Sequence, residues 1–146
     1  HLQNSARASF GVETIDKGKR ATLQMGRALN ENKIIAMLID QNDNKSELFV
    51  NFFGKLASCS KGTAAFHLLR RSPVVLVTCP YVDNRLEINF QHIQFDLTGN
   101  QEKDILEVNQ KITSALEKVI SQYPEQYFWM HRRWRARPPQ DPKKIY

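Results

Sequence analysis

The histidines are the side chains of this sequence best suited to chemistry, because a general base that deprotonates a hydroxyl is most often an imidazole. His67 stands between apolar residues of an expected helix, where a structural role is the favoured interpretation. His92 and Asp96 would share one face of an expected strand, since side chains alternate along it. They could form a base and its orienting carboxylate, but a chance polar pair on a solvated face is favoured. His131 belongs to a basic run near the C-terminus.

That run is part of the stretch YPEQYFWMHRRWRARPPQ, residues 123–140. Its aromatic residues are Tyr123, Tyr127, Phe128, Trp129 and Trp134, and its arginines are Arg132, Arg133, Arg135 and Arg137. If residues 124–134 form a helix, Tyr127, Met130 and Trp134 share one face, while Arg132 and Arg135 share another. We favour a helix that buries its aromatics over a grip on nucleic acid, which needs exposed aromatics interleaved with basic groups. No nucleic-acid partner is therefore expected.

Two further segments could bind anions or polar groups. Asp40 ends an expected strand, and strand ends are where open α/β sheets place ligands, although a hydrogen-bonded turn is the favoured interpretation. The segment FFGKLASCSKGTAAF leaves a strand at Gly54 and enters a helix near Gly62, with Lys55 and Lys61 adding positive charge. Backbone N–H groups at a helix start bind anions, but the spacing is not that of a P-loop.

Composition limits the class of protein. The chain has 146 residues, a net charge of +6 and 41% hydrophobic residues, which fits one domain over residues 1–146 with an anionic partner. No run is long and apolar enough to span a bilayer, and no signal peptide opens the sequence. Cys59 and Cys79 have no ligand spacing, so we expect free thiols in a reducing compartment, and neither metal nor cofactor.

Hydrophobic periodicity predicts an α/β fold in which a mixed, mostly parallel central sheet is layered with helices. Helices are expected over residues 17–33, 60–72 and 101–123. The unbroken apolar runs at residues 33–40 and 73–81 predict buried strands, the first of them parallel, and residues 47–54 predict another strand. Residues 85–90 and 92–97 alternate polar and apolar side chains, which is typical of half-exposed strands.

Four segments together resemble the bacterial lipid A biosynthesis acyltransferases, in the lysophospholipid acyltransferase superfamily. They are SARASFGVETI, LIDQN, LFVNFFGKLASCSKGTAAFHLLRRSPVVLV and the closing YPEQYFWMHRRWRARP, in the family's order and at similar spacing. The helix predicted over residues 101–123 matches the family's late helix. The resemblance covers nearly the whole chain, and its closing segment is the most specific part.

The resemblance implies an enzyme at the cytoplasmic face of the inner membrane. Such an enzyme moves a fatty acyl group from acyl carrier protein to a hydroxyl of a lipid A precursor, with the His of an H-x-x-x-x-D/E motif as the base. This chain departs from that motif, because Ala6, Ser72, Leu97 and Ala136 stand five positions after its histidines. We therefore expect the C-terminal portion of such an enzyme, without its catalytic pair or membrane-anchoring helix, and inactive alone.

The resemblance also implies substrate-binding residues but no catalytic ones in this chain. Arg7, Asp40 and Gln41 would lie near the acceptor. Lys61, Gly62, Arg132 and Arg133 would belong to a basic network that faces phosphates or is structural, with the arginines toward the membrane surface, sugar phosphates or internal carboxylates. Three alternatives stay open. One is an acyltransferase for another glycolipid, such as a phosphatidylinositol mannoside, and another is a non-catalytic basic module that binds anionic lipid or nucleic acid. The third is a natural short paralogue that has lost the chemistry and kept lipid binding.

Overall fold

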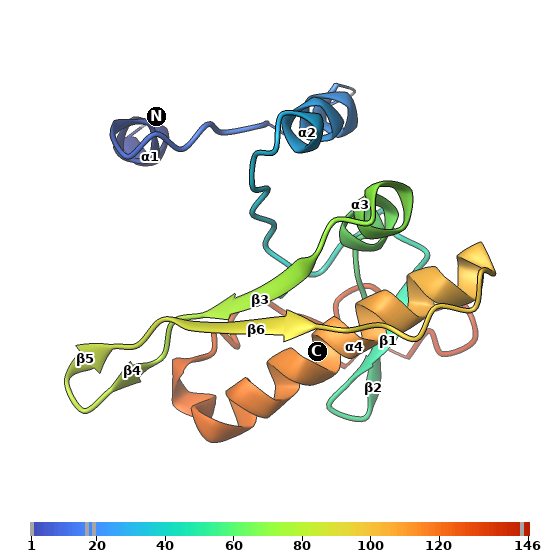
Figure 1. Ribbon diagram of the computed structural model, residues 1–146. Coiled ribbons are helices and arrows are strands. Elements are labelled where there is room, and N and C mark those ends of the chain that lie inside the picture. Colours follow the sequence, from blue (N-terminus) through green and yellow to red (C-terminus); the bar gives the residue numbers. More distant parts are fainter. Residues whose placement is uncertain (1, 17, 19, 144) are drawn as a thin grey trace. The chain divides into compact units, whose positions relative to one another are not determined.

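The computed structural model describes residues 2–16, 18, 20–143 and 145–146. The chain forms two compact units, residues 1–36 and residues 37–146 (Figure 1). Among the described residues, no helix is long and apolar enough to cross a bilayer.

The first unit contains α1 (Leu2–Ser9) and α2 (Ala21–Asn30). The chain leaves α2 through Asn32, whose φ of 58° is left-handed, and the N–H of Lys33 returns to the carbonyl of Ala28 at 2.9 Å. Such a left-handed residue is a common way to end a helix. Lys33 then pairs with Glu13 and Glu31 at 3.2 and 3.1 Å. The helix expected over residues 17–33 is thus confirmed over Ala21–Asn30, and its residues 17 and 19 lie outside the described part.

The second unit is built on one long helix, α4 (Gln101–Gln122). The side chain of Asn100 accepts the N–H of Lys103, which caps the helix start. The buried carboxylate of Asp104 accepts the backbone N–H groups of Thr98 and Gly99 at 2.7 and 3.0 Å. These bonds, first among them the one from Thr98, lower the pKa of Asp104. The start of α4 is therefore held by an ionised side chain.

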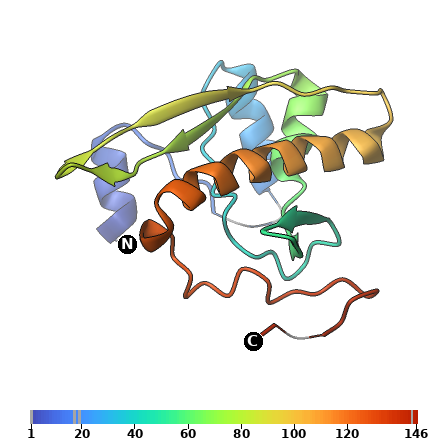
Figure 2. The same ribbon diagram turned by 90° about the horizontal axis from the view of Figure 1, so that it is seen from below.

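Two antiparallel hairpins pack against α4 (Figure 2). The first pairs β1 (Phe49–Phe52) with β2 (Lys55–Ser58) through a two-residue turn, Phe53–Gly54, in which both φ angles are positive. The second pairs β3 (Val74–Thr78) with β6 (Asn89–Ile93), and its tip is formed by β4 (Tyr81–Val82) and β5 (Arg85–Leu86). The two parts of the second hairpin share one register, interrupted at Pro80, which has no N–H to donate.

The core of the second unit lies on two sides of α4. One cluster joins α4 to the β3–β6 hairpin and to α3 (Gly62–Arg70), and it contains Ala64, Leu76, Ile93, Val108, Ile112 and Ala115. The other joins α4 to the β1–β2 hairpin and contains Phe52, Ala57 and Ile120. Tyr127 and Trp134 pack against this second cluster, which brings the segment after the short 3₁₀ helix η1 (Pro124–Gln126) onto the hairpin. That segment is orange to red in Figure 2.

The expected helix over residues 101–123 and the one over residues 60–72 are confirmed by α4 and α3. The expectation of a mostly parallel sheet is wrong for the described residues, because each strand pair among them is antiparallel. Residues 33–40 form no strand, and Ile34 and Leu38 are exposed. Residues 124–134 are not a helix beyond η1. β2 and α1 were not predicted.

Candidate functional site

The β1–β2 hairpin has its outer edges bonded by side chains rather than by further strands. On the β1 side, Gln110 of α4 accepts the N–H of Asn51 at 2.8 Å and donates to its carbonyl at 3.0 Å. About two helical turns further along α4, Glu117 accepts the N–H of Phe53. Helix α4 therefore satisfies the polar groups of this strand edge with two of its own side chains.

On the β2 side, arginines of the basic C-terminal run bond the polar groups of the strand edge. Arg137 donates to the carbonyl of Leu56 at 2.9 Å, and Arg133 donates to the carbonyl of Ser58. Leu56 and Ser58 are two residues apart, so their carbonyls point the same way from the strand. Arg137 is further fixed by an ion pair with Asp141. Two of the four arginines thus bond a strand edge.

Arg133 is the most buried of these groups, with only 3% of its surface exposed. Its guanidinium lies 5.4 Å from the centre of the Phe52 ring, within the range of a cation–π contact. Burial lowers the pKa of Arg133, while the Asp40 carboxylate acts in the opposite direction. A guanidinium remains charged in spite of such a shift. The structure therefore holds a positive charge beneath the hairpin.

Two weak acids beside this charge are kept neutral by burial. Burial raises the pKa of the Cys59 thiol to about 11, and Arg133 opposes that shift. Burial also raises the pKa of the Tyr127 phenol to about 12. Because a thiol attacks as its thiolate, Cys59 is poorly suited to nucleophilic catalysis at neutral pH. Tyr127 acts as a donor, to the carbonyl of Asp40 at 3.2 Å.

The loop after residue 40 joins the same arrangement. The N–H of Asn42 donates to Nε2 of His131 at 2.8 Å, and Oδ1 of Asn42 accepts from Ser58 Oγ at 3.0 Å and from the N–H of Ala136 at 2.9 Å. The Ser58 hydroxyl in turn accepts the N–H of Asp43. We call Asp40, Asn42, Ser58, Tyr127, His131 and Arg133 the Asp40–Arg133 junction. It fastens the C-terminal segment to the loop and to β2.

The residues expected to bind substrate have different surroundings. Asp40 and Arg133 both belong to the junction, whereas Gln41 and Arg132 are exposed beside it in the chain. Lys61 precedes α3 and is exposed, and the N–H of Gly62 donates to Ser60 Oγ at 3.2 Å, so Ser60 contributes to the cap. Arg7 belongs to the first unit, where its guanidinium donates weakly to Asn4 at 3.4 Å.

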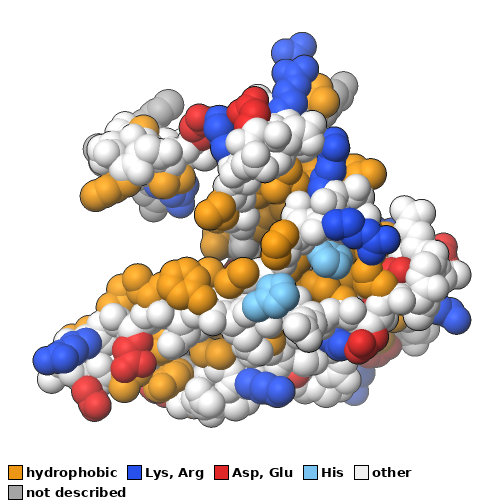
Figure 3. Space-filling view, viewed as in Figure 1, with side chains coloured by type: hydrophobic (Ala, Val, Ile, Leu, Met, Phe, Trp, Pro, Cys, Tyr) orange, Lys and Arg blue, Asp and Glu red, His pale blue; other side chains and the backbone are white. Residues whose placement is uncertain are grey.

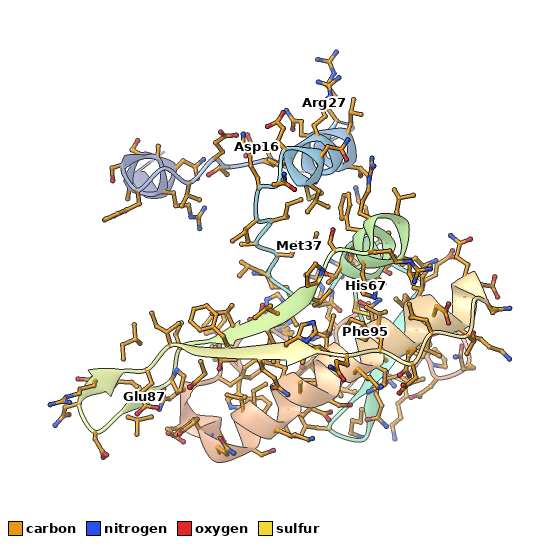
Figure 4. The ribbon with its side chains drawn as sticks, viewed as in Figure 1. Asp16, Arg27, Met37, His67, Glu87 and Phe95 are labelled. Atoms are coloured by element: carbon orange, nitrogen blue, oxygen red, sulfur yellow. The ribbon has the colours of Figure 1, made fainter. Side chains whose placement is uncertain are left out.

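Each described histidine either uses a ring nitrogen in a hydrogen bond to the backbone or has no carboxylate partner. Nδ1 of His67 lies 2.8 Å from the carbonyl of Ser72, and its ring packs on Phe95 at 4.7 Å (Figure 4). The lone pair of His131 Nε2 is used by Asn42. Asp96 pairs with Lys111 rather than with His92. No described histidine therefore forms the base–carboxylate pair of a general-base mechanism, and His1 lies outside the described residues.

Sequence reasoning missed Asn42, Ser58 and Arg137 as members of this region. Asn42 carries the clearest signal, since Asn in a QNDN loop readily bonds neighbouring backbone groups. Ser58 and Arg137 give none, because their partners are distant in the sequence. The Asp40–Arg133 junction as a whole fixes the C-terminal segment, the loop after residue 40 and β2 around the buried guanidinium of Arg133.

The second unit combines two antiparallel hairpins supported by α4 with a basic, aromatic closing segment. The sequence matches the family model described as bacterial lipid A biosynthesis acyltransferase over residues 1–136, and the chain belongs to that family. It is therefore of an acyltransferase class of enzyme. No curated protein matches the sequence.

Proposed function

We propose that this protein takes part in transferring a fatty acyl group from acyl carrier protein to a hydroxyl of a lipid A precursor, at the cytoplasmic face of the inner membrane. The observation that carries the proposal is the family match, which spans residues 1–136. In this reaction a base removes the hydroxyl proton, a C–O ester bond forms at the thioester carbonyl, and the C–S bond breaks to release a thiol.

Within that reaction, we assign this chain the framework and acceptor side rather than the proton transfer. The described histidines offer no free base paired with a carboxylate, and the buried thiol of Cys59 is neutral. Exposed cations are more suitable for substrate contacts. Arg132 and Lys61 are exposed and have no ion pair among the described residues, so they could bind acceptor phosphates.

The test is an acyl-transfer assay with acyl carrier protein thioester and a lipid A precursor, read by mass spectrometry of the lipid product. The protein expressed from the whole gene that encodes this chain should acylate the precursor, whereas residues 1–146 alone should not. Failure of the whole gene product on every lipid A precursor would refute the function. Turnover by residues 1–146 alone would refute the assignment of proton transfer to other residues.

A paired substitution separates binding from framework. Arg132→Ala should raise KM for the acceptor by roughly tenfold, the loss of one charge-assisted contact, without changing the melting temperature. Arg133→Ala should lower the melting temperature and the amount of active enzyme together. If Arg132→Ala leaves KM unchanged, Arg132 does not bind the acceptor.

A further inference from the structure

Several large apolar side chains are exposed where the β1–β2 turn meets the C-terminal segment. Phe53 in the turn is 39% exposed, and Phe128, Trp129 and Met130 are 67%, 45% and 82% exposed. We call these four residues the aromatic rim. Three of them are consecutive, so the rim is a concentrated patch rather than scattered surface residues.

The rim is held in place by specific contacts. The ring centres of Phe53 and Trp129 are 6.0 Å apart, and those of Tyr127 and Trp129 are 4.8 Å apart. Nε1 of Trp129 donates to the carbonyl of Pro124 at 2.7 Å. The N–H of His131 donates to the carbonyl of Phe128 at 3.1 Å, which closes a turn around Trp129 and Met130. These side chains are therefore presented to solvent by an ordered backbone.

Positive charge flanks the rim. Lys55 follows the β1–β2 turn, and Arg132 and Arg135 follow Met130, and all three are exposed. None of the three forms an ion pair among the described residues, whereas Arg133 and Arg137 of the same run bond strand carbonyls. Of the acids close to the rim in sequence or by contact, Glu125 is exposed, and Glu117 accepts the N–H of Phe53 through its carboxylate. The charge without an ion pair beside the rim is thus mainly positive among the described residues.

Aromatic side chains beside free Lys and Arg match the chemistry of an anionic bilayer surface. Trp and Phe settle at the headgroup level of a bilayer, and flanking cations bind anionic headgroups. We propose that the aromatic rim, with Lys55, Arg132 and Arg135, is the surface by which this chain binds an anionic phospholipid bilayer. The inference rests on the proposed function in that a membrane-embedded acceptor requires the enzyme to reach the bilayer surface.

A second apolar surface supplies the matched control. The outer face of the β3–β6 hairpin exposes Val75, Val77 and Phe90, at 46%, 49% and 72% (Figure 3). It lies across from α4, and its hairpin tip carries the acids Asp83 and Glu87 together with Arg85. The acids at its tip do not favour an anionic bilayer.

The experiment is co-sedimentation of residues 1–146 with vesicles of equal parts phosphatidylcholine and phosphatidylglycerol, and with vesicles of phosphatidylcholine alone. Binding should require phosphatidylglycerol and weaken with added salt. The double variant Phe128→Ser and Met130→Ser should lose binding by roughly tenfold or more, as should Lys55→Glu with Arg132→Glu. Phe90→Ser should bind as the unchanged chain does. Circular dichroism of each variant shows that it is folded.

Fluorescence gives a second, independent readout, because the chain has two tryptophans. Brominated lipids should quench Trp129, so Trp129→Phe should abolish quenching in a chain that keeps Trp134. Quenching that survives Trp129→Phe, or loss of binding in Phe90→Ser with the rim variants unaffected, would overturn the proposal. Equal binding to vesicles without phosphatidylglycerol would also overturn it.

These vesicles contain neither acceptor nor acyl donor, so the outcome is separate from that of the acyl-transfer assay. If the whole gene product acylates a lipid A precursor in detergent but the rim variants bind vesicles normally, only the rim inference fails. If the rim binds vesicles and no precursor is acylated, only the proposed function fails.

Discussion

The two hairpins that share α4 differ in how much of their surface is covered. In the β1–β2 hairpin, Val50, Phe52 and Ala57 are buried, and both strand edges are hydrogen-bonded to side chains of α4 or of the C-terminal segment. In the β3–β6 hairpin, Leu76 and Ile93 are buried on α4, while the opposite face stays exposed. One helix therefore supports a largely enclosed hairpin on one side and a half-enclosed one on the other.

The difference lies in the C-terminal segment. Its Trp134 ring packs 5.4 Å from Phe52, and Nε1 of Trp134 donates to the Phe52 carbonyl at 3.2 Å. Arg133 and Arg137 bond the β2 edge in the same region. A segment with little regular structure thus does for the first hairpin what a neighbouring strand or helix usually does. The basic run is consequently divided between arginines that build the fold and arginines that remain free to bind.

The largest expected effect comes from removing the centre of the enclosed hairpin. Phe52→Ala should lower the free energy of unfolding by about 3–5 kcal/mol, because the buried ring contacts α4, Tyr127 and Trp134. Phe90→Ala on the open hairpin should change it by less than about 0.5 kcal/mol. Urea denaturation followed by circular dichroism measures both. Equal losses in the two variants would show that the open face is in fact covered in solution.

Removing the buried arginine tests whether the C-terminal segment stabilises the hairpin. Arg133→Ala should cost about 2–3 kcal/mol, since it leaves the Ser58 carbonyl without its donor and removes packing on Phe52. Arg135→Ala, in the same run but exposed, should stay within about 0.5 kcal/mol. Arg133→Met sharpens the comparison, because recovery in that variant would assign the effect to packing rather than to the hydrogen bond.

Acidification should weaken the support that the two hairpins share. The folded-state pKa of Asp104 is lowered, so its contribution to stability is present above the pKa of the unfolded chain, about 4, and is lost as the pH falls through the folded value. Asp104→Asn should therefore be less stable at neutral pH and show a smaller loss on acidification. Thermal melts between neutral and acidic pH measure this loss of stability. Glu102→Gln, at an exposed position of the same helical turn, is the control. If Asp104→Asn and the unchanged chain lose stability equally on acidification, Asp104 does not have this role.

Elements of the fold were predictable where their signals are local in the sequence. Helix α4 was predicted nearly to its bounds because its apolar period is a local signal. The β1–β2 turn was missed because Phe53 is an unusual residue at a positive φ, and only Gly54 marks it. Residues 33–40 were misassigned because an apolar run predicts burial but not a pairing partner.

The candidate site was less predictable than the fold. The C-terminal segment was expected to be a helix, yet Trp129, Arg133 and Trp134 each bond a backbone carbonyl that their side chains reach outside a helix. Tertiary contacts therefore outweigh the helical spacing of its aromatics. The hydrogen bond from Tyr127 to the Asp40 carbonyl joins segments far apart in the chain, and no pattern within either segment specifies it.

The smallest effect concerns the two cysteines, each of which follows a strand of one of the two hairpins. Cys59 follows β2 and is buried with a pKa raised to about 11, whereas Cys79 follows β3 and is exposed. At mildly alkaline pH, a maleimide should label Cys79 rapidly and Cys59 only when the chain is denatured. Since an unfolded thiol ionises near pH 8.5, stability should also fall between that pH and about 11, and less so in Cys59→Ala. Mass spectrometry of the labelled chain gives the order, with Cys79→Ser as control. Rapid labelling of Cys59 in the folded chain would mean that the covered hairpin opens more readily than the exposed one, and would reverse the comparison.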